Sequence, residues 1–167
     1  DRSQILDSML QRLLNLPLAA QPGEKWMYSI AVDVQGKLIE ALSGKRLDEF
    51  FAERVFKPLA MQDTAFYVPA EKLDRLTVNY GKKDGRLSPV DDAKTSQFAT
   101  QPALLSGGGG LVSTADDYLR FAQMMLNRGQ LGGVRVLKPE TVDLMTQNHL
   151  ADALVPITLG PIQMANT

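Results

Sequence analysis

The stretch "QPGEKWMYSIAVDVQGKLIE", residues 21–40, joins a turn, an aromatic pair and a long amphipathic run. Pro22 and Gly23 stand where a type II turn requires them, because proline fixes its own φ and glycine readily adopts a positive φ. From Tyr28 the apolar residues recur at three- and four-residue steps, which predicts a helix that ends at a glycine cap, Gly44. The tyrosine is therefore expected directly after a fixed turn and at the start of a helix.

The rest of the chain is predicted to be mainly helical. Pro139 starts a short helix that runs to Met145, and three longer segments show a helical apolar period. These segments are Ile5–Leu14, Leu47–Phe56 and the run after Thr114, in which Leu119, Phe121, Ala122, Met125 and Leu126 form the expected buried face. A short strand is expected around residues 65–68, and the polar residues 81–98 predict a surface hairpin or loop.

Two sets of glycines predict places where backbones approach closely. Gly36 lies inside the first helix, where glycine costs about 1 kcal/mol relative to alanine, so a packing reason is expected. Gly107–Gly110 precede a helix that Ser113 or Thr114 can cap. The lysine and the spacing of nucleotide-binding loops are missing around these glycines, so we expect their backbone to lie against another strand or a substrate.

Composition and charge argue against several function classes. The 167 residues carry 18 basic and 19 acidic side chains, a net charge of −1 without long blocks of either sign, so no nucleic acid or membrane partner is expected. There is no cysteine, and the single histidine, His149, stands near a helix end, where a solvated or capping role is expected. No metal site is predicted.

Tyr28 has two interpretations on these grounds. A tyrosine at a helix start has its hydroxyl near unpaired backbone donors and the positive end of the helix dipole, which favours the phenolate and a role in proton transfer. Alternatively, its ring is half-buried and packs beside Trp26. The residues alone leave both interpretations open.

Three blocks of the sequence, in this order, resemble the serine β-lactamase-like superfamily. They are "QPGEKWMYS", "DVQGKLIEALSGKRLDEFFAERVFKPLAMQDTAF" and "SGGGGLVSTADDYLRFAQMMLNRGQLGGVRVL". The chain is most similar to carboxylesterases that share the class C β-lactamase fold, the family VIII esterases. The resemblance implies a mainly α chain, the helical part of an α/β fold with only short strands. It also implies that Tyr28 assists a serine nucleophile without a cofactor, and that Gly108 and Gly109 contact the substrate.

Two positions depart from the family pattern. Ile30 stands where β-lactamases and penicillin-binding peptidases have asparagine, which favours a small ester substrate over a β-lactam or peptide. Ala60 replaces the glycine of the family's Pro-Leu-Gly-Met block, and we expect this change to concern packing. The alternatives are a β-lactamase or D-Ala-D-Ala peptidase-type enzyme and a non-catalytic binding relative.

The family's Ser-x-x-Lys nucleophile motif is absent from these 167 residues. We therefore expect residues 1–167 to be one segment, the helical region of a β-lactamase-like domain truncated at both ends. Such a segment is predicted to be inactive alone, because the nucleophile and its base act as a unit. Its apolar stripes are expected to cause self-association or to be covered by a partner chain.

Overall fold

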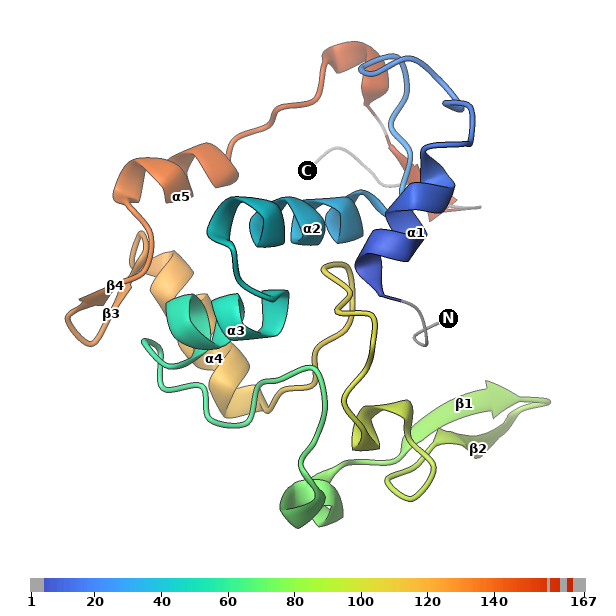
Figure 1. Cartoon of the computed structure of the whole chain (residues 1–167), viewed down its shortest axis with the longest axis vertical. Coiled ribbons are helices and arrows are strands. Elements are labelled where there is room, and N and C mark those ends of the chain that lie inside the picture. The colour runs from blue at the N-terminus through green and yellow to red at the C-terminus, as the bar shows by residue number, and fades with distance from the viewer. Residues whose placement is uncertain (1–4, 156, 160–161, 164–167) are drawn as a thin grey trace.

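The computed structural model describes residues 5–155, 157–159 and 162–163, and helices predominate in it (Figure 1). The α-helices are α1 (Leu6–Leu13), α2 (Ala31–Ser43), α3 (Leu47–Phe51), α4 (Ala115–Leu126) and α5 (Pro139–Met145). A π-helical turn, Ala52–Phe56, continues α3, and short 3-10 helices span Ala70–Arg75, Gln97–Ala99 and Asp152–Leu154. The expectation of a mainly helical chain with only short strands is confirmed.

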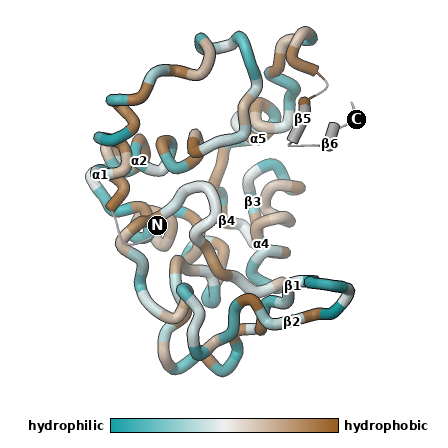
Figure 2. The backbone as a smooth tube through the Cα atoms, turned by 90° about the vertical axis from the view of Figure 1, so that its right-hand side faces the viewer, coloured by the Kyte–Doolittle hydropathy of each residue, from teal (hydrophilic) through white to brown (hydrophobic). Residues whose placement is uncertain are grey.

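The strands of the described residues form three separate antiparallel pairs. They are β1 (Asn79–Lys83) with β2 (Arg86–Asp91), β3 (Gln130–Leu131) with β4 (Val134–Arg135), and β5 (Thr158–Leu159) with β6 (Ile162–Gln163). The β1–β2 hairpin, predicted from its polar turn, projects from the helices, and its tip is hydrophilic (Figures 1 and 2). The strand expected at residues 65–68 is wrong, because only the single bridge Ala65–Val112 forms there.

The turn before α2 forms as predicted, but the helix starts later than expected. Gly23 has a φ of 86°, and the N–H of Glu24 donates to the carbonyl of Gln21 at 3.1 Å. α2 begins at Ala31 and ends at the left-handed Gly44, with a φ of 68°. Tyr28 therefore lies in the irregular segment before the helix and not in its first turn, since an apolar period gives the face of a helix but not its first residue.

Two clusters of apolar side chains form the core. One contains Phe56, Leu59, Met61 and Met124, with Met124 from α4 fully buried. The other contains Leu47, Phe66 and Leu105. Phe51 packs against both, and its ring stacks on that of Phe66 at a centroid distance of 6.2 Å. These contacts fix α3 and α4 as one unit.

The buried face predicted for α4 is partly wrong. Met124 is the fully buried side chain, whereas Leu119 and Leu126 are 54% and 82% exposed. The outer face of α2 is also open, since Leu38 is 56% and Leu42 80% exposed. Helical periodicity identifies an apolar stripe, but whether a neighbour covers the stripe depends on tertiary packing.

Ala60 corrects another expectation. Its φ is 53°, in the left-handed region that glycine adopts without strain, and its side chain is exposed. The departure from the family's Pro-Leu-Gly-Met block therefore concerns the backbone and not packing. An alanine in this region is strained because its Cβ approaches the carbonyl oxygen.

Candidate active site

Three residues singled out from the sequence, Tyr28, Gly108 and Gly109, line one depression of about 320 Å³. Asp33 and Ser106 line it as well. The tyrosine comes from the segment before α2, and the glycines come from the loop before α4, so the fold brings together positions about eighty residues apart. The roles predicted for the three residues stay predictions.

Tyr28 is exposed at the wall of this depression. Its side chain is 77% accessible, and its ring stacks on Trp26 with centroids 6.3 Å apart and planes 25° from parallel. The stacking expected from the sequence is present, but the ring is not half-buried. An exposed phenol on a fixed aromatic support can meet a ligand in the depression.

The glycine loop, residues 106–110, lies against α2 rather than against a strand. A Cβ on Gly107 would lie 2.4 Å from the carbonyl oxygen of Val32, and the Cα of Gly107 would be 3.6 Å from a Cβ on Gly36. The close backbone packing predicted from Gly36 is therefore confirmed. A Cβ on Gly110 would lie 2.9 Å from the Phe66 ring, whereas one on Gly109 would meet no atom within 4 Å.

Asp33 and Ser106 were not identified from the sequence. The Ser106 hydroxyl donates to Asp33 Oδ1 at 2.6 Å. The N–H of Gly108 points at the same Oδ1 at 3.4 Å and at Ser106 Oγ at 3.2 Å. Asp33 looks in sequence like an ordinary polar residue of an amphipathic helix, and a contact between residues so far apart leaves no local pattern.

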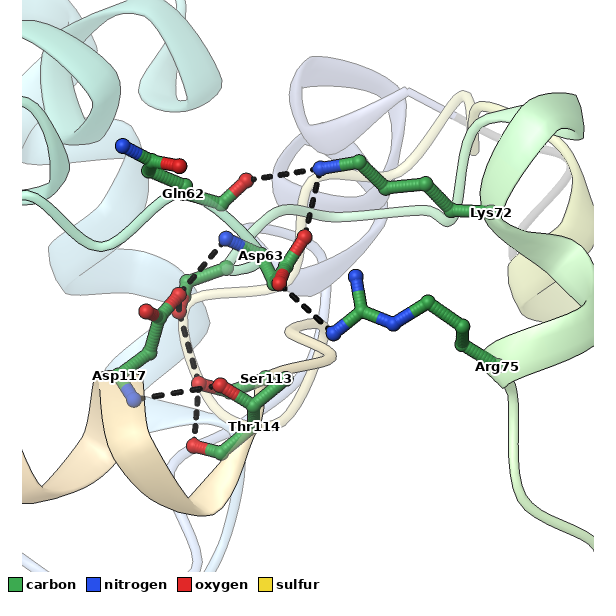
Figure 3. A network of polar contacts seen from close by, with 8 residues as sticks. Gln62, Asp63, Lys72, Arg75, Ser113, Thr114 and Asp117 are labelled. Carbon is green, nitrogen blue, oxygen red and sulfur yellow. Dashed lines mark hydrogen bonds and ion pairs between the residues drawn. The ribbon is translucent and has the colours of Figure 1, made fainter.

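A second carboxylate, Asp117, holds the start of α4 (Figure 3). It is 6% exposed and accepts hydrogen bonds from the Thr64 hydroxyl and the Asp63 N–H, both at 2.8 Å. Thr114 caps α4 by accepting from the N–H of Asp117 at 3.2 Å, and Thr64 also bonds Ser113 at 2.7 Å. All these groups satisfy one another, which is typical of a structural junction.

Asp63 extends this junction to the surface (Figure 3). Its carboxylate accepts from Lys72 at 2.6 Å and from Arg75 at 2.9 Å. These hydrogen bonds, Arg75 first and then Lys72, lower the pKa of Asp63 to about 2. The residues border a cavity of about 390 Å³, but both cations are already paired with Asp63.

Other chemistry finds little support among the described residues. His149 lies after α5, and its exposed ring has Nε2 2.6 Å from the Leu144 carbonyl, which agrees with the capping alternative of the predicted solvated or capping role. Within that part of the chain, no three His, Cys, Asp or Glu side chains gather as metal ligands. No helix there has the length and apolar character of a membrane span.

The sequence model of the family described as Beta-lactamase matches residues 1–156. The chain belongs to the beta-lactamase family. The resemblance noted in the sequence is thus confirmed, and the helices described above are a helix-rich part of this fold.

Two curated relatives each match more than four fifths of this chain. Protein Rv1367c of Mycobacterium tuberculosis (strain ATCC 25618 / H37Rv) is 42% identical over 150 residues, 87% of this chain and 36% of the relative. Lovastatin esterase of Penicillium rubens (strain ATCC 28089 / DSM 1075 / NRRL 1951 / Wisconsin 54-1255) is 33% identical over 145 residues, 85% of this chain and 35% of the relative. The chain thus spans about a third of the length of these curated relatives.

Among solved structures, EstCE1, a hydrolase with promiscuous acyltransferase activity, matches with a TM-score of 0.74. It is 29% identical, and the match covers 92% of this chain and 43% of that one. The family is therefore one of enzymes, in which hydrolases and esterases share the fold.

Proposed function

We propose that this chain supplies the catalytic tyrosine of a serine hydrolase that cleaves small carboxylic esters through an acyl-serine intermediate. The proposal rests on the observation that Tyr28 and the glycine loop line one depression. The names of two relatives, an esterase and a hydrolase, support ester chemistry. The serine and lysine of the Ser-x-x-Lys motif would lie outside these 167 residues, in a longer protein that we call the parent enzyme.

Tyr28 would move one proton in each half of the reaction. Acting as general base, it takes the proton of the serine hydroxyl while the serine oxygen bonds the ester carbon. It then returns the proton to the alkoxide as the bond between carbon and the leaving alcohol breaks. In the second half it takes a proton from the water that attacks the acyl carbon, and returns it to the serine oxygen as the acyl-serine bond breaks and the carboxylic acid is released. Such acid–base assistance typically contributes about 10²- to 10⁴-fold in rate.

The residue two positions after the tyrosine supports an ester as substrate. Ile30 is 36% exposed and carries no amide that could bond a β-lactam or a peptide side chain. Hydrolysis of the β-lactam nitrocefin, or stable acylation of the parent enzyme by penicillin, would instead favour the β-lactamase or peptidase alternative. A parent enzyme without a Ser-x-x-Lys motif would favour a non-catalytic relative.

Acyl transfer to an alcohol is a second candidate, favoured by the acyltransferase activity in the name of EstCE1. Both reactions share the acyl-serine and differ only in whether water or an alcohol accepts the acyl group. Product analysis with and without an added primary alcohol separates them. An ester of the added alcohol would identify transfer, and free acid alone would identify hydrolysis.

Tyr28→Phe in the parent enzyme tests the assignment, because it keeps the ring and removes the proton. We expect kcat on a p-nitrophenyl ester to fall about 10²- to 10⁴-fold. Tyr118→Phe is the matched control, since Tyr118 is also exposed, at 66%, and its ring also pairs with a neighbour, Phe121, at 6.3 Å. An unchanged kcat in Tyr28→Phe would contradict the proposal.

The 167-residue chain by itself would lack turnover, because Tyr28 has no serine proton to take. The exposed leucines of α2 and α4 support self-association, or a partner chain over that face. An ester assay and sedimentation of the purified chain test both statements. A stoichiometric burst of product would contradict the first, and a folded monomer at high concentration would contradict the second.

A further inference from the structure

The glycine loop has to be fixed from outside, because its glycines have no side chains that could hold it. Consecutive glycines lose more conformational freedom on ordering than other residues. Gly107 and Gly110 are fixed by close packing on Val32 and Phe66. Gly108, which lines the depression, is instead bound by hydrogen bonds to Asp33 and Ser106.

Asp33 connects this loop to the element that follows the tyrosine. It stands in the first turn of α2, five residues after Tyr28, and its carboxylate is half-buried. The bond from Ser106 Oγ, at 2.6 Å, is short and charge-assisted, and such bonds are about twice as strong as neutral ones. One carboxylate oxygen thus ties together the two segments that form the walls of the depression.

A first-turn aspartate has an ordinary explanation, since it complements the helix dipole. Asp116 in the first turn of α4 fits that explanation, because its side chain is exposed. Asp33 differs from it, because its Oδ1 is bound by a segment 73 residues away. The orientation of Asp33 toward the glycine loop therefore requires a reason beyond the dipole.

We propose that Asp33 is a positioning residue that fixes Gly108 beside Tyr28 and so shapes the wall of the depression in which the ester binds. Ser106 takes part by presenting its hydroxyl between the carboxylate and the Gly108 N–H. The inference rests on the proposed function, because it assigns the loop to the substrate of that reaction. Asp33 acts through the loop and takes no proton from the substrate.

The test compares Asp33→Ala, Asp33→Asn and the dipole control Asp116→Ala in the parent enzyme, with a p-nitrophenyl ester as the probe. Asp33→Ala is expected to lower kcat/KM about 10- to 100-fold, the factor that corresponds to a hydrogen bond with a charged group. Most of the loss is expected in KM, because Tyr28 is untouched. Asp33→Asn keeps an acceptor for Ser106 and Gly108 and should restore most of the activity.

Ser106→Ala removes the hydroxyl that donates to Asp33. Because Asp33 and Ser106 bond each other and both bond the Gly108 N–H, the double variant with Asp33→Ala should lose less than the sum of the two single losses. Additive losses would overturn the inference. So would equal losses in Asp33→Ala and Asp116→Ala, which would leave only the dipole as explanation, or wild-type kcat/KM in Asp33→Ala.

Hydrogen exchange of residues 106–110 tests whether Asp33 holds this loop, independently of the proposed function. If Tyr28→Phe were fully active, the proposed function would fail, yet the contact between Asp33 and the loop could still be measured. Faster exchange of this loop in Asp33→Ala, with wild-type exchange in Asp116→Ala, would support a role of this contact in holding the loop. Unchanged exchange in Asp33→Ala would overturn it, whether or not the enzyme cleaves esters.

Discussion

Asp33 and Asp117 each stand in the first turn of a helix and each bind a distant loop, but their surroundings differ. Asp117 is 6% exposed, and its hydrogen-bond donors are enclosed with it between α4 and the loop at Asp63 and Thr64. Asp33 is half-buried at the edge of a depression that Tyr28 also lines. The same side chain at the same helix position therefore serves structure in one place and, by our proposal, borders the ester site in the other.

The physical reason is solvation. A buried carboxylate is tolerated only when its bonds are fully made, and removal of one partner leaves the others without water or protein to bond. A carboxylate at an open depression can exchange a lost partner for water, so its removal affects stability less. The comparison thus predicts that variants of the two aspartates separate stability from activity.

Asp117→Ala should have the largest effect on stability. We expect the free energy of unfolding of the parent enzyme to fall by about 3 kcal/mol, because the Asp63 N–H and the Thr64 hydroxyl lose their buried acceptor. Asp33→Ala should lower it by only about 1 kcal/mol. Urea denaturation of both variants measures the difference, and equal losses would mean that Asp33 is structural as well.

The glycine loop gives a matched pair within four residues. Gly107→Ala should lower the free energy of unfolding by about 2 kcal/mol, since its Cβ would lie 2.4 Å from the Val32 carbonyl oxygen. Gly109→Ala should change it by less than about 0.5 kcal/mol, because that Cβ meets open space. Urea denaturation again provides the measurement.

A larger side chain at Gly109 tests the depression through enzyme activity. Gly109→Val should lower kcat/KM on the ester without a matching loss of stability, because it enlarges a residue that lines the same depression as Tyr28 and has open space around its Cβ. A Gly109→Val variant with wild-type kcat/KM and wild-type melting would show that this glycine borders no substrate.

Ala60→Gly should raise the free energy of unfolding by about 1 kcal/mol, because it relieves a left-handed alanine. Ala60 precedes the loop that Asp117 holds, and strained residues persist where neighbouring contacts fix the backbone. Ala41→Gly in the exposed face of α2 is the control and should lower stability by about 1 kcal/mol. A higher melting temperature for Ala60→Gly and a lower one for Ala41→Gly would support the interpretation. A lower melting temperature for both variants would contradict it.

Asp63 should give the smallest effect on stability, present at neutral pH and lost at low pH. Its pKa in the folded protein, about 2, lies below the ordinary value of 3.8, so its contribution is complete above that ordinary value. As the pH falls from about 4 toward 2, protonation removes this contribution. The difference in urea midpoint between wild type and Asp63→Asn should therefore shrink over that range. A constant difference down to about pH 2 would show that the ion pairs with Lys72 and Arg75 do not stabilise the fold.

Local features were predictable from the sequence because their causes are local. The Pro22-Gly23 turn, the Gly44 cap and the short helix from Pro139 follow from φ preferences and apolar period. The start of α2 was not predictable, because an apolar residue, Ile30, precedes its first turn and extends the period. The expected strand at residues 65–68 failed for a similar reason, since a strand requires a partner and only Val112 pairs there.

For the candidate site, the sequence by itself determined the residue types, and the family blocks drew attention to Tyr28, Gly108 and Gly109. Only the tertiary structure decided that these residues line one depression and that Asp33 and Ser106 connect its walls. It also decided which glycines are tightly packed and which one is open. The reason is that such contacts depend on the relative placement of α2 and the glycine loop. That placement is set by packing between residues far apart in the chain, which no local pattern records.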